Sequence, residues 1–264
     1  MTFSKIFSKL SSLTCLGLFS GFAVASNQLC QRPITIGWEN WPPYQYEKNI
    51  RNTKKITGLD LEIVQSILDD MGCQSVYVSM PWKRHLTQVQ QGLLDLATGA
   101  SLTPEREQFV YFSDAYRNET MSLFVLKESL EKIKFQKIIQ LEHSNFLLGL
   151  VFGYEYGNDF NQLKQSSFKK NIFEVNHSEK NFKKLLKNEI QGLLEDKIVG
   201  HFYLKLNKLQ DRISEHPLFV NSDPVYIMLS KKSLNEDFLR AFNQSLKKLK
   251  DSGKLNQIIN GYIN

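Results

Sequence analysis

Side chains suited to binding a charged small molecule lie in three separate segments of the chain. The first segment holds Trp41, the second holds Trp82, and the third, GASLTPER at residues 99–106, holds Ser101 and Arg106. Indole rings form rigid apolar walls, and a guanidinium group binds a carboxylate through two parallel hydrogen bonds. The combination predicts a site for a small molecule that carries a carboxylate group.

Arg106 occupies an unusual position for a cation. Thr103 is suited to cap the N-terminus of a helix and Pro104 to occupy its first position, so Arg106 falls in the first helical turn. Helix N-termini carry partial positive charge, and a cation there costs a few tenths to about 1 kcal/mol unless an anion faces it. We therefore expect Arg106 to face an anion, with the helix end adding to the attraction for a ligand carboxylate.

The three segments follow predicted strands in the first part of the chain. Strands and helices alternate over residues 33–38, 58–71, 73–79, 82–91 and 93–98, beginning and ending with a strand. This order is typical of a parallel sheet, whose ligands bind beyond the carboxyl ends of its strands. Taken singly, each tryptophan could be a core residue, but three segments at one sheet edge favour a binding site.

A second α/β set follows, and it predicts an α/β fold with two lobes. Its strands are expected at 120–126, 147–152, 172–175, 192–194 and 224–230, and its helices at 158–165, 178–187, 197–207, 235–251 and 254–263. Residues 26–119 and 225–264 would form lobe I, and residues 120–224 lobe II. Two extended crossings, near residues 119 and 224, would join the lobes and leave a cleft between them.

The first 25 residues are typical of a secretory signal peptide. Lys5 and Lys9 precede an apolar run, and the run is followed by Ala23-Val24-Ala25, a small-x-small cleavage pattern. The alternative is an N-terminal membrane anchor. Cleavage removes 25 of 264 residues, two of them lysines, and leaves 239 residues with a formal net charge of +4. This mild charge argues against a nucleic-acid partner, and no later apolar run is long enough to cross a membrane.

Two cysteines remain after cleavage, and their positions favour a disulfide. Cys30 precedes the first predicted strand and Cys73 opens the second, so adjacent parallel strands would bring them together. The alternative is two free buried thiols. The histidines show no spacing typical of metal ligands, so we predict no metal and no other cofactor; they are His85, His143, His177, His201 and His216.

Several motifs of lobe I together resemble those of the family 3 periplasmic solute-binding proteins, the polar amino-acid receptors of ABC transporters. The matching stretches are WPPY at 41–44, GLDLEI at 58–63, PW at 81–82, GLLD at 92–95, SLTPER at 101–106 and FSDAY at 112–116. Residues 243–262 match the closing helices of the family more loosely. The resemblance implies a type II-like periplasmic-binding-protein fold with hinge-linked lobes, in a periplasmic, monomeric protein that serves an ABC permease in the inner membrane.

The resemblance also implies a role for each candidate residue. Trp41 and Trp82 fall on the aromatic positions that sandwich the ligand, Ser101 on the hydroxyl that accepts from the α-amino group, and Arg106 on the carboxylate clamp. Asp196, in the second lobe, falls on the carboxylate that pairs with the α-ammonium. A zwitterion that leaves water needs both of its charges matched, so these roles suit an amino-acid-like ligand.

Two departures from the family pattern concern the binding site. The spacing from Asp95 to Ser101 is one residue shorter than usual. The second lobe usually offers a Gly-Thr pair for the ligand carboxylate, but this chain has Gly153, Tyr154 and Glu155 there. Either the ligand is not a standard α-amino acid, or the Tyr154 hydroxyl replaces that of threonine.

Two other functions remain open at this stage. The fold also resembles that of periplasmic cyclohexadienyl dehydratases. If this chain were such an enzyme, its Glu155 in the cleft could act as a general acid. The sequence offers no paired carboxylate and no His, Ser or Cys arrangement beside Glu155, so we expect a binding protein and not an enzyme. The second alternative is a receptor for a membrane sensor, which we expect to be a separate chain because no signalling domain follows Asn264.

Overall fold

The computed structural model describes residue 1, residues 29–50 and residues 52–263. The predicted signal peptide, apart from its first residue, lies outside these described residues. None of the helices in the described part is long and apolar enough to cross a membrane.

Lobe I is built around three parallel strands. Strand β1 (Ile34–Trp38) lies between β4 (Ser75–Ser79) and β5 (Leu96–Ala100), and both neighbours run parallel to it. Helices α1 (Leu59–Asp70) and α2 (Trp82–Gln91) make the crossovers. The predicted alternation of strands and helices is therefore confirmed, and the carboxyl ends of the three strands meet at one edge.

One predicted strand begins later than expected. The sequence predicts a strand from Leu93, whereas β5 starts at Leu96. Gly92 caps α2 in the left-handed conformation (φ 78°), and the amides of Leu93 and Leu94 both donate to the carbonyl of Gln88. The chain is thus still closing the helix where the strand was expected, and Leu93 is exposed.

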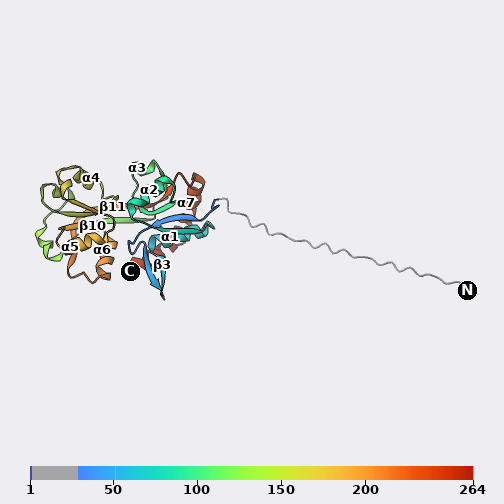
Figure 1. Cartoon of the computed structure of the whole chain (residues 1–264), viewed down its shortest axis with the longest axis horizontal. Helices are drawn as coiled ribbons and strands as arrows, with labels where there is room; N and C mark the ends of the chain where they lie inside the picture. Colours follow the sequence, from blue (N-terminus) through green and yellow to red (C-terminus); the bar gives the residue numbers. More distant parts are fainter. Residues whose placement is uncertain (2–28, 51, 264) are drawn as a thin grey trace.

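Several short elements have no counterpart in the sequence prediction. They are the hairpin of β2 (Tyr46–Ile50) and β3 (Thr53–Thr57), strand β6 (Val110–Phe112), and the 3₁₀ helices η1 (Lys127–Lys132), η2 (Ile138–His143) and η3 (Ser167–Asn171). The four-residue helix α3 (Pro104–Glu107) begins where the sequence predicts a helix start, with Thr103 as its cap. The hairpin projects from lobe I beyond the rest of its ribbon (Figure 1).

The strands of lobe II form the mixed end of the same hydrogen-bonded sheet. Strand β10 (Gly192–Asp196) pairs antiparallel with β7 (Arg117–Leu126) and parallel with β8 (Leu148–Val151), and β9 (Ile172–Val175) pairs with β8. Helices α4 (Asn158–Gln165), α5 (Glu179–Leu186) and α6 (Lys197–Leu206) belong to this lobe. Figure 1 shows them at the opposite end of the molecule from α1, α2 and α7.

Two long strands connect the lobes. Strand β11 (Ile213–Ser230) is much longer than the predicted strand at 224–230, because its first half pairs antiparallel with β7. Residues 117–120 of β7 pair with residues 222–225 of β11, and we call this four-residue ladder the crossing. Helices α7 (Glu236–Asp251) and α8 (Lys254–Ile263) then return to lobe I and pack against α1. The two-lobed α/β architecture is as predicted, and the expected boundaries near residues 119 and 224 fall in the crossing.

The disulfide predicted from the sequence is present in the structure. Cys30 lies just before β1 and Cys73 just after α1, and their Cα atoms are 5.5 Å apart. The bond closes a loop with a sequence separation of 43 residues, which includes most of the first βα unit and the hairpin.

We expect the double variant Cys30→Ser/Cys73→Ser to unfold more easily than the wild type. A loop of this length restricts the unfolded chain enough to contribute about 4 kcal/mol in the loop-entropy model. Urea denaturation of the oxidised and dithiothreitol-reduced proteins measures the effect. Reduction should lower the stability of the wild type and leave the variant unchanged; equal stability of oxidised and reduced wild type would refute the contribution.

Candidate functional site

Five of the six residues that the sequence predicts for the site surround one cavity between the lobes. Lobe I contributes Trp41, Trp82, Ser101 and Arg106, and lobe II contributes Tyr154. The space left between these side chains is about 20 Å³, which is room for roughly one water molecule. Three carboxylates that the prediction did not assign to binding also line the cavity: Glu39, Glu119 and Glu155.

The two tryptophans are buried, and each makes a hydrogen bond from lobe I to lobe II. Trp41 Nε1 donates to Glu195 Oε1 (3.0 Å), and Trp82 Nε1 donates to the carbonyl of Gly153 (2.9 Å). Tyr154 approaches both indoles edge-on, with ring centroids 5.9 Å from Trp41 and 6.5 Å from Trp82. The tyrosine therefore packs against both of the walls that the sequence predicts for a ligand.

The loop that carries Trp41 is held in shape by its own backbone. Trp41 N donates to the carbonyl of Gln45 (2.7 Å), and the amides of Tyr44 and Gln45 donate back to the carbonyl of Trp41. The Gln45 side chain accepts from the amide of Glu39 (3.1 Å), at the end of β1. These bonds set the direction of the Trp41 side chain before any contact with lobe II.

Arg106 projects from the short helix α3, where Thr103 Oγ1 accepts from the Arg106 amide (3.3 Å) as the predicted cap requires. Its guanidinium donates to the carbonyls of Ser101 (2.8 Å) and Gly153 (2.9 Å). The nearest carboxylate is that of Glu155, 3.7 Å away in the opposite lobe. Burial lowers the pKa of Arg106, and Glu155 partly opposes that shift. The anion that Arg106 was expected to face is, in this structure, a side chain of the protein itself.

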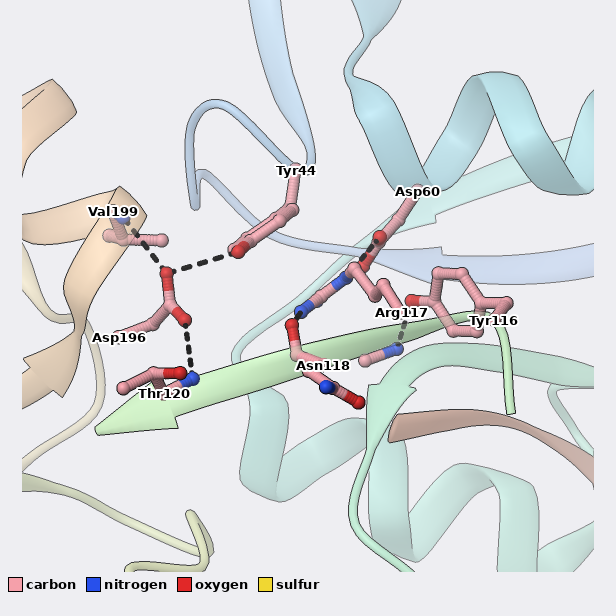
Figure 2. A network of polar contacts seen from close by, with 9 residues as sticks. Tyr44, Asp60, Tyr116, Arg117, Asn118, Thr120, Asp196 and Val199 are labelled. Atoms are coloured by element: carbon pink, nitrogen blue, oxygen red, sulfur yellow. Dashed lines mark hydrogen bonds and ion pairs between the residues drawn. The ribbon is translucent and has the colours of Figure 1, made fainter. Parts of the chain in front are cut away.

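Asp196, the sixth predicted residue, does not line the cavity. It is 1% exposed and caps α6, accepting from the amide of Val199 (3.0 Å). Its carboxylate also accepts from the Tyr44 hydroxyl (3.1 Å) and the amide of Thr120 (3.3 Å), as Figure 2 shows. Asp196 therefore stabilises a helix start and the contact between the lobes, and its pairing with a ligand ammonium remains a prediction.

A buried ion pair supports the wall behind Trp41. Arg117 donates from Nε to Asp60 Oδ1 (2.8 Å) and from Nη2 to Asp60 Oδ2 (3.0 Å) (Figure 2). Gly99 lies against this pair with φ 68°, and a Cβ there would come within 3.3 Å of Arg117, Asp60 and Trp41. The left-handed φ and these close neighbours favour glycine at this position. The spacing from Asp95 to Ser101 had not indicated this constraint. The prediction had assigned no role to Arg117.

Burial raises the pKa of Glu39 and of Glu195 at the lobe interface. Glu39 accepts from the Trp82 amide and the Tyr154 hydroxyl (both 3.2 Å), and these bonds only partly offset the burial that raises its pKa to about 8. The pKa of Glu195 is raised to about 7, again mainly by burial. Glu39 follows β1 directly, so the strand-end argument used for Trp41 could have identified it.

We expect Glu39→Gln to flatten the dependence of stability on pH. The folded state keeps a proton on Glu39 up to a pKa of about 8, whereas the unfolded chain releases it near 4.5. The wild type therefore loses stability as the pH rises from about 5 to 8, and the amide removes this contribution. Urea denaturation at pH 5, 6.5 and 8 measures it, with the exposed Glu128→Gln as control. A slope equal to that of the wild type would rule out the raised pKa.

A model of the bacterial extracellular solute-binding proteins, family 3, matches residues 34–264. No curated protein matches the sequence significantly. An amino acid ABC transporter substrate-binding protein from Streptococcus pneumoniae, solved with L-arginine bound, has 22% identity and a TM-score of 0.74 over 88% of this chain and 94% of that one.

Two other similar structures link the fold to a sensor and to an enzyme lineage. One is a histidine kinase sensor domain with similarity to periplasmic binding proteins, with 16% identity and a TM-score of 0.75 over 88% of this chain and 96% of that one. The other is an ancestral amino-acid-binding protein described as a precursor of cyclohexadienyl dehydratase, with 19% identity and a TM-score of 0.72 over 88% and 95%. At these identities the likeness shows a common fold.

Proposed function

Because the chain belongs to the bacterial extracellular solute-binding proteins of family 3, we propose that it captures a small amino-acid-like ligand between its lobes for uptake by an ABC permease. The solved relative that binds L-arginine supports a ligand of this class. The proposal includes export to the periplasm after signal-peptide cleavage and action as a monomer.

The observation that carries the proposal is the setting of Arg106. Its side chain is 6% exposed, lies at the cavity and donates to two carbonyls, and its closest carboxylate among the described residues is that of Glu155, at 3.7 Å. The Glu155 side chain is 33% exposed and can turn to solvent. A ligand carboxylate that took its place would gain hydrogen bonds from a buried guanidinium, a strong class of interaction.

Ligand entry requires a rearrangement around Tyr154. A cavity of about 20 Å³ is too small for an amino acid, so either Tyr154 leaves its place against the two tryptophans or the lobes separate. Both movements break hydrogen bonds between the lobes, among them the one from the Tyr154 hydroxyl to Glu39. We propose that the ligand then lies between Trp41 and Trp82, with the Ser101 hydroxyl accepting from its amino group.

Binding rather than catalysis is the function that this site supports best. The similarity to a dehydratase precursor and to a sensor domain concerns the fold, and we propose neither activity for this chain. Incubation with prephenate tests the first alternative, because steady conversion would show an enzyme. A gene neighbourhood with a permease and an ATPase favours transport, whereas an isolated gene favours sensing.

We expect Arg106→Ala to weaken binding of the ligand roughly 10- to 100-fold, the usual cost of losing a hydrogen bond to a charged group. A thermal-shift screen against the amino acids and small organic acids identifies the ligand, and calorimetry compares the variants. Arg106→Lys, which keeps the charge but not the paired geometry, should bind with intermediate affinity. Equal affinity of the wild type and Arg106→Ala would show that Arg106 does not hold the carboxylate.

We expect Glu155→Gln to bind the same ligand several-fold more tightly than the wild type. The substitution removes the carboxylate that competes with the ligand for Arg106, and a gain of roughly 1 kcal/mol corresponds to about fivefold. Calorimetry measures it, with the exposed Glu128→Gln as the matched loss of charge. Weaker binding by Glu155→Gln would instead show that Glu155 contacts the ligand.

A further inference from the structure

Glu119 is an acidic side chain in the cavity for which the described residues offer no hydrogen-bond or ion-pair partner. It lies on β7 within the crossing, lines the cavity and is only 8% exposed. Its backbone belongs to the β7–β11 ladder, but its carboxylate makes no hydrogen bond or ion pair with any of the residues that the structure describes. The side chain is thus more than nine-tenths buried while its carboxylate reaches the cavity, where a group that enters the cavity can bind it.

The neighbouring acids differ from Glu119 because each has several donors. Asp196 accepts from one hydroxyl and two amides, Glu195 from Trp41, Ser178 and a backbone amide, and Glu39 from one hydroxyl and one amide. Asp60 is paired with Arg117. Each of these acidic groups at the lobe interface therefore has hydrogen-bond donors from the described residues, and Glu119 differs from them in having none.

The electrostatic surroundings of Glu119 favour a cation beside it. Burial raises the pKa of Glu119 well above its ordinary value, Arg117 opposes this shift, and the nearby Asp196 and Glu195 add to it. Arg106 is the only cation that lines the cavity among the described residues, and it points to Gly153 and Glu155. A positively charged group placed beside Glu119 would offset both the burial and the repulsion between the acids.

We propose that Glu119 binds the ammonium group of the ligand, in the role that the family resemblance gives to Asp196. This inference rests on the proposed function, in which Arg106 holds the carboxylate of the same ligand. The two side chains line one cavity, and an ammonium group beside Glu119 would hold it in its charged form, opposite in sign to Arg106, as a zwitterion requires. Asp196 keeps its three donors and remains the cap of α6 and the partner of Tyr44.

Two pairs of probes that differ only in the amino group test this assignment. One pair is L-arginine and 5-guanidinopentanoate, and the other is L-glutamine and glutaramate. Calorimetry compares each pair on the wild type, Glu119→Gln and Glu119→Asp. The matched control is Asp223→Asn, because Asp223 pairs with Glu119 across the crossing but is exposed and does not line the cavity.

We expect the wild type and Asp223→Asn to bind the amino-bearing member of a pair roughly 10-fold or more tightly than its partner. Glu119→Gln should lose this preference without a lower melting temperature, because the amide keeps the size of the side chain and cannot take the charged form that burial disfavours. Glu119→Asp should keep part of the preference. Melting curves show whether each variant is folded.

Different outcomes separate the two proposals. If Glu119→Gln keeps the preference for the amino-bearing probe, Glu119 does not bind the ammonium group and the proposed function still stands. If Glu119→Gln weakens both members of a pair equally and melts earlier, Glu119 is structural and the inference is wrong. If the wild type binds no amino acid at all in the earlier screen, the proposed function fails and this inference fails with it.

Discussion

The buried ion pair between Arg117 and Asp60 fixes the point at which the chain leaves lobe I. Arg117 begins β7, Asp60 lies in the first turn of α1, and both side chains are almost fully buried. Removing one partner from such a pair typically costs 3–5 kcal/mol, because the other charge is left buried and uncompensated. The guanidinium also lies 3.6 Å from the centre of the Tyr44 ring, which tightens the same junction.

This junction extends to the cavity and across the lobes. Gly99 packs directly on the ion pair, and its amide donates to the Tyr116 hydroxyl (3.0 Å). Tyr44, stacked on Arg117, donates to Asp196 in lobe II, so a connected set of polar contacts runs from one lobe to the other (Figure 2). The wall behind Trp41 and the contact between the lobes therefore share one support.

The sequence predicted correctly the elements that depend on the spacing of apolar residues and on the order of strands and helices along the chain. Helices with a clear apolar face matched their predicted bounds, and the strand-end rule brought Trp41, Trp82 and Arg106 to one cavity. The hairpin at 46–57 has polar residues on both faces, and the first half of β11 becomes a strand only by pairing with β7, so neither has a local signal. The same limit applies to Glu119, because its burial results from the meeting of two lobes. Which carboxylates at the lobe interface accept hydrogen bonds, and which one does not, depends on contacts between distant segments that the sequence does not reveal.

The position of Glu119 in the crossing has a consequence for the order of events during binding. A hydrogen-bonded pair of strands resists stretching and sliding, so lobes joined in this way move mainly by rotation about the pair. A group on the axis of a rotation moves little, whereas Tyr154 and Glu155, away from it in lobe II, travel further. The proposed partner of the ammonium is thus in place while the lobes are apart. On this view the ammonium group of the ligand contacts Glu119 first, and the side chain of the ligand packs against lobe II only after the lobes close.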